Sequence, residues 1–182
     1  MKIQRKQQGM LGFTMIEVLI AILIVSFSLL GMAGLVTRST SVEVDAIQRT
    51  QALMMVRDMV ERIQLNRVDA LAGRYGRADA LMGAVNNCTG VVDMVERDFC
   101  EWGNQLAGVN ESQGGSASSV LLGARGCVTL VPGSTNAYVV TVSWRGLTPV
   151  AAPADVCGVV DGEDLSVLRA ATSRVELGRL DG

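Results

Sequence analysis

Glu17 carries a carboxylate at the start of a long apolar segment. A carboxylate inside a membrane helix is costly and usually marks function, so Glu17 needs a cationic partner. If Phe13 became a free N-terminus, its amine would be such a cation and would lie close to Glu17 of its own or a neighbouring helix. Pairing would offset part of the burial penalty, and it would fix the axial register between subunits.

The cysteines are the second group of residues whose positions suggest chemistry. There are four of them: Cys88, Cys100, Cys127 and Cys157. All follow the apolar segment, and no two are spaced as C-x-x-C. An even number beyond a membrane segment indicates two structural disulfides in an oxidising compartment. We expect Cys88 to pair with Cys100 and Cys127 with Cys157, although four cysteines permit three pairings and the sequence alone does not choose among them.

The chain contains no histidine. This removes the Ser-His-Asp and Cys-His arrangements of hydrolases and weakens any proposal of catalytic zinc. The acidic run from Asp161 to Asp164 lacks the ligand spacing of an EF-hand loop, so we expect a solvated turn there rather than a calcium site. We therefore expect no enzyme activity, no metal site and no cofactor.

Charge is distributed unevenly along the 182 residues. Three basic residues precede the apolar segment, and the first twelve residues include no acidic one. Basic residues before an apolar segment act as an insertion signal and stay in the cytoplasm. The other 170 residues carry 13 basic and 18 acidic side chains, a net charge of −5. This balance gives no strong signal for nucleic-acid binding.

The apolar segment, residues 13–36, is predicted to be a membrane helix. The 19 residues from Val18 to Val36 carry no charge, which is enough for a helix to cross a bilayer core of about 30 Å. Glycine weakens a helix interior, so Gly31 and Gly34 predict a local bend or loosening near its far end.

Residues 37–72 are predicted to continue this helix as an amphipathic half. Their apolar residues recur mostly at three- and four-residue steps: Ile47, Leu53, Val56, Val60 and Ile63. No Pro or Gly interrupts the stretch, so we predict one helix from about Thr14 to Leu71. The alternative is a short anchor, a break near residues 37–41 and a separate helix. Arg62 and Asn66, four residues apart, are expected to brace the loop that follows, with partner binding as the alternative.

Residues 73–182 are predicted to form a globular head. A second amphipathic helix is expected over residues 91–108, with a regular apolar stripe: Val92, Val95, Phe99, Trp102 and Leu106. A sheet is expected over 118–182, with strand-like runs at 120–122, 127–131, 137–144, 165–169 and 174–180 and a hairpin turn at 132–136. The fold class is therefore α+β, with a small antiparallel sheet against the long helix.

The segment Gly12-Phe13-Thr14-Met15-Ile16-Glu17 follows basic residues and directly precedes the apolar run. It resembles the leader of type IV pilins and pseudopilins. The resemblance implies that residues 1–12 are a leader peptide, that a prepilin peptidase cuts between Gly12 and Phe13, and that Phe13 becomes N-methylated. Two alternatives remain: an ordinary signal anchor with Glu17 near the membrane interface, and a secretory signal peptide cut near Ala33.

Later motifs resemble the minor pilin family PilV, the type IV pilus modification proteins. They lie at residues 61–67, 72–75, 98–102, 123–127, 142–147 and 157–158. This resemblance implies a type IV pilin-like fold and a subunit that primes pilus assembly and joins the fibre, supporting twitching motility and adhesin display.

The implied partners are other minor pilins, the major pilin, the prepilin peptidase, the inner-membrane assembly platform and a tip adhesin. The implied location is a single pass through the bacterial inner membrane with the C-terminal domain in the periplasm, and then the pilus fibre. A type II secretion pseudopilin and a membrane-anchored periplasmic ligand-binding module are the alternative functions.

Overall fold

The computed structural model describes residues 12–77, 81–83, 85–109 and 119–178. The expected leader, residues 1–12, lies outside the described residues except for Gly12. The chain divides into two compact units, Met1–Val42 and Glu43–Gly182. We refer to the second unit as the head.

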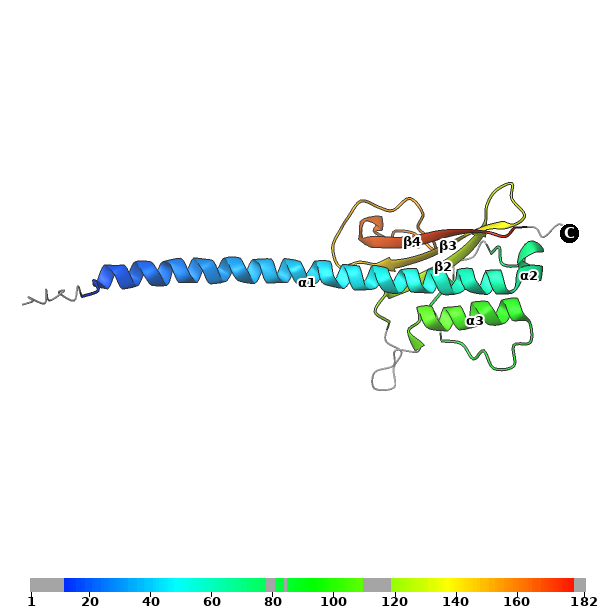
Figure 1. Ribbon diagram of the computed structural model, residues 1–182, viewed down its shortest axis with the longest axis horizontal. Coiled ribbons are helices and arrows are strands. Elements are labelled where there is room, and N and C mark those ends of the chain that lie inside the picture. Colours follow the sequence, from blue (N-terminus) through cyan, green and yellow to red (C-terminus); the bar gives the residue numbers. More distant parts are fainter. Residues whose placement is uncertain (1–11, 78–80, 84, 110–118, 179–182) are drawn as a thin grey trace, which may run out of the picture. The chain divides into compact units, whose positions relative to one another are not determined.

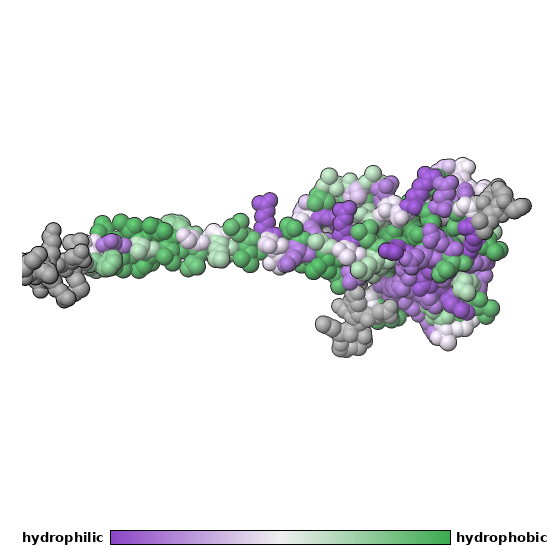
Figure 2. Space-filling view, viewed as in Figure 1, coloured by the Kyte–Doolittle hydropathy of each residue, from purple (hydrophilic) through white to green (hydrophobic). Residues whose placement is uncertain are grey.

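The first unit consists of the N-terminal part of helix α1, which spans Met15–Leu65. This part is long and apolar enough to cross a membrane, and its most apolar window buries no surface within the protein. Figure 2 shows it covered mainly by hydrophobic side chains. The helix continues through Gly31 and Gly34 without the expected loosening, and through residues 37–41, where the alternative interpretation placed a break.

Hydroxyl groups in the apolar part of α1 are satisfied within the helix. Ser26 and Ser28 donate hydrogen bonds to the carbonyl oxygens four residues earlier, at 2.7 and 2.8 Å. Such local bonds remove the cost of exposing an unpaired hydroxyl to hydrocarbon. The two serines are therefore compatible with a membrane segment.

The head combines the remainder of α1 with two further α-helices and a sheet (Figure 1). The elements after α1 are α2 (Arg67–Leu71), β1 (Leu81–Met82), α3 (Met94–Leu106), β2 (Leu122–Leu130), β3 (Ala137–Arg145), the 3₁₀ helix η2 (Leu165–Val167) and β4 (Leu168–Glu176). The four strands lie in the order β1-β2-β3-β4, and every neighbouring pair is antiparallel. A long N-terminal helix and a small antiparallel sheet thus form an α+β layout.

The long helix ends earlier than predicted. Asn66, with φ −97° and ψ 60°, interrupts the helical backbone, and the residues predicted to complete α1 form the separate helix α2. Asparagine has a weak helix propensity, which favours such a break, and its side chain donates to the Tyr75 hydroxyl at 3.2 Å without capping α2. The predicted end of the long helix at Leu71 is therefore wrong: α1 ends at Leu65, and α2 covers the remaining residues to Leu71.

Helix α3 begins at Met94 rather than near residue 91, because Asp93 caps it. The Asp93 side chain accepts a hydrogen bond from the backbone N–H of Glu96, which satisfies one of the free donors at the helix start. Val92 lies before the cap and is 89% exposed, so it does not belong to the buried stripe. The other four stripe residues, including Trp102, are buried as predicted.

The sheet differs from the prediction in its strand boundaries. One strand, β2, replaces the strands predicted at 120–122 and 127–131: it begins only at Leu122 and ends at Leu130, with an irregularity between Leu122 and Arg125 where Gly123 has φ 59°. The two predicted C-terminal strands are replaced by the single strand β4. The turn at 132–136 joins β2 to β3 as predicted, with Val131 donating to the carbonyl of Ala137 at 2.9 Å.

The core lies between the C-terminal half of α1, α3 and one face of the sheet. The buried residues of α1 are Gln48, Ala52, Val56, Met59 and Ile63. Two residues of the predicted stripe, Ile47 and Leu53, are 52% and 47% exposed instead. The predicted stripe mixed two faces of the helix, and only one of them meets the sheet.

Candidate functional site

Gly12 and Phe13, the predicted cleavage residues, lie just before α1, outside regular secondary structure, and both are exposed. The Phe13 side chain is 83% exposed. Thr14 starts the helix, because its carbonyl accepts bonds from the N–H groups of Glu17 and Val18 at 3.1 and 3.3 Å. A peptide bond outside regular structure is accessible to a protease.

Glu17 lies in the first turn of α1, where a negative charge favourably meets the positive end of the helix dipole. It lines a shallow groove of about 330 Å³ on one side of the helix. Phe13 lines the same groove, together with apolar and small residues further along: Val18, Ala21, Ile22, Val25 and Ser26. The two residues singled out in the sequence thus share one side of the helix start. The Glu17 carboxylate thus lies among apolar and small side chains on this side of the helix.

The cysteines form two disulfides in the head, Cys88–Cys100 and Cys127–Cys157, which is the pairing favoured from the sequence. Their Cα atoms are 5.8 and 5.9 Å apart. The first joins the segment before α3 to the middle of that helix. The second joins β2 to the long connection between β3 and η2. Both disulfides are structural crosslinks between segments of the head.

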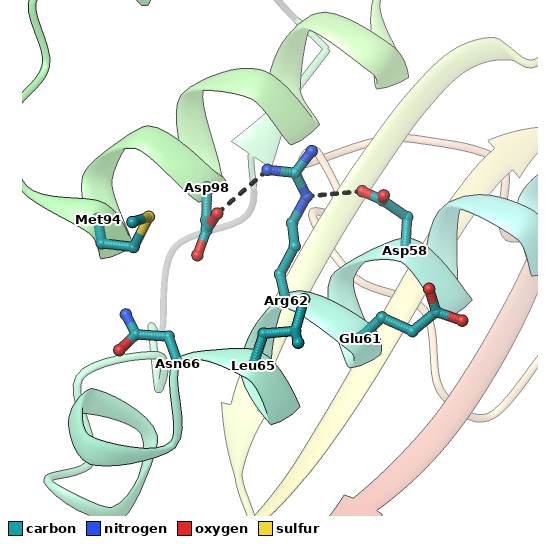
Figure 3. A pocket seen from close by; sticks show the side chains of 7 residues that line it. All are labelled: Asp58, Glu61, Arg62, Leu65, Asn66, Met94 and Asp98. Atoms are coloured by element: carbon teal, nitrogen blue, oxygen red, sulfur yellow. Dashed lines mark hydrogen bonds and ion pairs between the residues drawn. The ribbon is translucent and has the colours of Figure 1, made fainter.

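A second group of polar side chains surrounds Arg62, at the end of α1 (Figure 3). The Arg62 guanidinium donates to Asp58 at 2.8 Å on its own helix, and to Asp98 and Glu101 of α3 at 3.1 and 2.7 Å. Burial lowers the pKa of Arg62, but the bonds to Glu101, Asp58 and Asp98 outweigh it and raise the pKa above its usual value. Arg62 therefore stays charged and ties α1 to α3.

Asp98 extends this network to the loop after α2. It is buried, and it accepts a hydrogen bond from the Tyr75 hydroxyl. Burial, followed by the bond to Asp98, raises the pKa of Tyr75. Asn66 donates to the same Tyr75 oxygen at 3.2 Å. Arg62 and Asn66 thus brace the loop below α1 as expected, through Asp98, a partner that the sequence did not reveal.

The Arg62 network borders an open pocket of about 530 Å³. Its lining combines the network with exposed side chains (Figure 3): Asp58, Glu61, Arg62, Leu65, Asn66, Met94 and Asp98. Arg62 and Asp98 already pair with each other, and the Asp58 carboxylate pairs with Arg62. These charged groups are therefore held by ion pairs with one another.

Arg125 and Glu163 form a buried ion pair that the sequence analysis missed. Two nitrogens of Arg125 contact the two carboxylate oxygens of Glu163 at 2.5 and 2.7 Å, and the two side chains are 6% and 2% exposed. The bonds from Arg125 lower the pKa of Glu163 to about 2, against the opposing effect of burial. The predicted solvated turn is therefore wrong for Glu163, while Asp161 and Asp164 on either side are exposed as expected.

No sequence signal pointed to this pair, because Arg125 lies between the strands predicted at 120–122 and 127–131. The structure includes Arg125 in β2, and buried charges are almost always paired. Nothing in the spacing identified Glu163, 38 residues later, as its partner.

Comparisons of the chain with protein-family models, with curated proteins and with solved structures found no match.

Proposed function

We propose that this chain is a minor subunit of a type IV pilus, made as a membrane-anchored precursor. The observation that carries the proposal is the segment Gly12–Glu17, an exposed Gly-Phe bond followed by a carboxylate at the start of an uncharged helix. A prepilin peptidase cuts after Gly12, and Phe13 is N-methylated. Glu17 then pairs with the amine of Phe13 on its own or a neighbouring chain, and a pair between chains sets their axial register.

The two units suit successive environments in this proposal. The apolar part of α1 buries nothing within the protein, so it needs another apolar surrounding, first the bilayer and then the helical core of a fibre. Its far end carries the disulfide-bearing head. Disulfides form in oxidising compartments, which supports a periplasmic head.

In this role the chain joins other minor pilins in a complex that primes assembly, which the major pilin then extends. It encounters the prepilin peptidase and the inner-membrane assembly platform on the way, and it helps to display a tip adhesin and support twitching motility. The role is structural and needs no catalysis or cofactor. The absence of histidine from the sequence supports this.

Intact-mass analysis of the protein isolated from its host membrane tests the proposal. We expect a loss of residues 1–12 and one added methyl group on Phe13. The matched variant Gly12→Leu should keep the full mass, because a bulky side chain beside the scissile bond blocks the peptidase. A wild-type chain that retains its N-terminal residues would contradict the pilin pathway.

A further inference from the structure

A second open pocket of the head lies between α3 and the segment that precedes it. Its volume is about 560 Å³, within the range of about 300–1,000 Å³ that is usual for small-molecule sites. Figure 2 shows mainly hydrophilic side chains over the part of the head that contains α3. Six polar residues line the pocket: Asn86, Asn87, Thr89, Arg97, Glu101 and Asn104. We call it the polar pocket.

The two walls of the polar pocket are fixed to each other. The disulfide Cys88–Cys100 crosslinks the segment before α3 to the helix. The Asn104 side chain accepts a hydrogen bond from the backbone N–H of Asn86 at 2.7 Å and donates to the carbonyl of the same residue at 2.9 Å. Arg97 donates to the carbonyl of Val91 at 2.9 Å. Because the walls are held at three places, a ligand would find them already ordered.

Four side chains of the polar pocket keep polar atoms without a hydrogen-bond partner among the described residues. Asn87 uses its amide oxygen to accept from the backbone N–H of Thr89 at 2.9 Å, which leaves its NH₂ group. The Thr89 hydroxyl is unpaired, and Arg97 keeps its Nη1 group after bonding Val91. Glu101 gives one carboxylate oxygen to Arg62 and keeps the other. These atoms are available to a ligand.

The available atoms combine hydrogen-bond donors with acceptors. The Asn87 amide and the Arg97 guanidinium donate, the Glu101 carboxylate accepts, and the Thr89 hydroxyl can do both. The charges of Arg97 and Glu101 cancel, so the lining has no excess charge with which to attract an ion. One free carboxylate oxygen is also too few for calcium, which takes six or more oxygen ligands.

We propose that the polar pocket binds a neutral sugar. Each hydroxyl of a sugar ring both donates and accepts a hydrogen bond, which matches the mixed set of available atoms. The inference goes beyond the proposed pilus role and does not depend on it. The expected affinity is low, with a Kd on the order of 1 mM, because each hydrogen bond to an exposed group replaces one to water.

Saturation-transfer NMR on the full chain tests this inference, since the method detects weak binding. The chain is held in micelles of lauryldimethylamine oxide, a detergent without a sugar headgroup. The probes are glucose, galactose, mannose and N-acetylglucosamine, with N-acetylneuraminate as an anionic comparison. We expect transfer to at least one of the four neutral sugars and none to N-acetylneuraminate.

Thr89→Val locates the binding site, because it removes the hydroxyl and nearly preserves the volume of an exposed side chain. It should raise the Kd by roughly three- to tenfold, the loss expected for one hydrogen bond. The matched control is Thr129→Val, which makes the same change at an exposed position in β2, outside the polar pocket. This control should bind like the wild type.

Three outcomes would overturn the inference. Transfer to none of the four neutral sugars would remove the ligand, and a preference for N-acetylneuraminate would assign an anion site instead. An unchanged Kd in Thr89→Val would place any sugar binding elsewhere on the chain. By contrast, a chain that binds the sugar in the polar pocket but keeps residues 1–12 in its host membrane would refute only the pilin assignment.

Discussion

Glu163 illustrates how much one side chain depends on its fold. In the sequence it stands in an acidic turn between Asp161 and Asp164, where solvation is the natural expectation. In the structure it is buried, and Arg125 and Arg145 contact its carboxylate, at closest 2.5 and 3.2 Å. The partner is set by how β2 and the later connection meet, which no local pattern encodes. Single residues with long-range partners were therefore the hardest to predict.

The substitution Glu163→Gln should destabilise the head by about 3 kcal/mol near neutral pH, because it leaves the Arg125 charge buried without its partner. The folded-state pKa of about 2 lies below the usual glutamate value of 4.5. The ion pair therefore adds stability above about pH 4.5, and this is lost as the pH falls towards 2.

Urea unfolding of the full chain in detergent, followed from pH 7 to pH 2, measures this effect. The difference between wild type and Glu163→Gln should shrink on acidification. Asp161→Asn, at the exposed neighbouring position, should change stability by less than about 0.5 kcal/mol. A gap between wild type and Glu163→Gln that is independent of pH would contradict the proposed ionisation.

At the scale of elements, local sequence patterns predicted the long helix, the helix α3 and the hairpin. They did not predict which face of α1 is buried. The structure buries Gln48 in the stripe, where its amide donates to the carbonyl of Val120 at 3.1 Å and accepts from Trp144 at 3.3 Å. A polar residue with two hydrogen-bond partners is stable in a core, but a search for apolar residues at helical spacing does not detect it. The exposed apolar residues Ile47 and Leu53 misled the prediction in the opposite direction.

The packing of α3 on β2 depends on a glycine. A Cβ atom at Gly126 would collide with the ring of Trp102 and would lie 2.8 Å from Leu106. Trp102 is fully buried, and its indole N–H donates to the Met55 carbonyl at 3.0 Å, so the ring has little room to shift. The absent side chain is what allows helix and strand to approach.

The substitution Gly126→Ala should destabilise the head by about 2 kcal/mol through overpacking. The loss should be smaller when Trp102→Leu is already present, because the smaller side chain relieves the collision. Chemical unfolding of the four chains of this double-mutant cycle measures it. Gly178→Ala serves as the control, since a Cβ there meets no atom within 4 Å. Equal costs of Gly126→Ala in both backgrounds would show that Trp102 is not the obstacle.

The disulfides should differ in their contribution to stability. Cys127–Cys157 has a sequence separation of 30 and Cys88–Cys100 one of 12. The chain-entropy model then gives about 3.6 and about 2.8 kcal/mol, because a longer closed loop restricts the unfolded chain more. Replacing both cysteines of a pair with serine should therefore cost more for Cys127 and Cys157. Urea unfolding of the two variants under oxidising conditions measures this, and the reverse order would contradict a mainly entropic contribution.

At the scale of the whole molecule, composition alone separated an apolar anchor from a globular part with four cysteines. The structure also divides the chain into two compact units, but their boundary follows Val42, so residues 43–65 of α1 belong to the head and not to a separate amphipathic segment over 37–72. The α+β fold class can be predicted from the periodicity of apolar residues, because each helix or strand buries one apolar face. The Arg62–Asp98 contact and the Arg125–Glu163 contact depend on three-dimensional packing, which periodicity does not contain.

The fate of the whole subunit should depend on Glu17. The substitution Glu17→Ala should leave membrane insertion intact, because removal of a carboxylate makes the segment more apolar. Incorporation into pili should fall at least tenfold, since the amine of Phe13 would lose the partner that fixes the axial register. Immunoblotting of membranes and sheared fibres, in cells lacking the wild-type copy, separates the two steps.

Ser28→Ala is the matched control for Glu17→Ala. It also removes a polar group from α1, but the Ser28 hydroxyl bonds only to its own helix, at the carbonyl of Ile24. This variant should insert and assemble like the wild type. Normal incorporation of Glu17→Ala into fibres would contradict the register role, whereas loss of both variants from the membrane would point to a defect in insertion. Because insertion and assembly are measured in the same cells, a selective loss from fibres ties the Glu17 carboxylate to contacts between subunits.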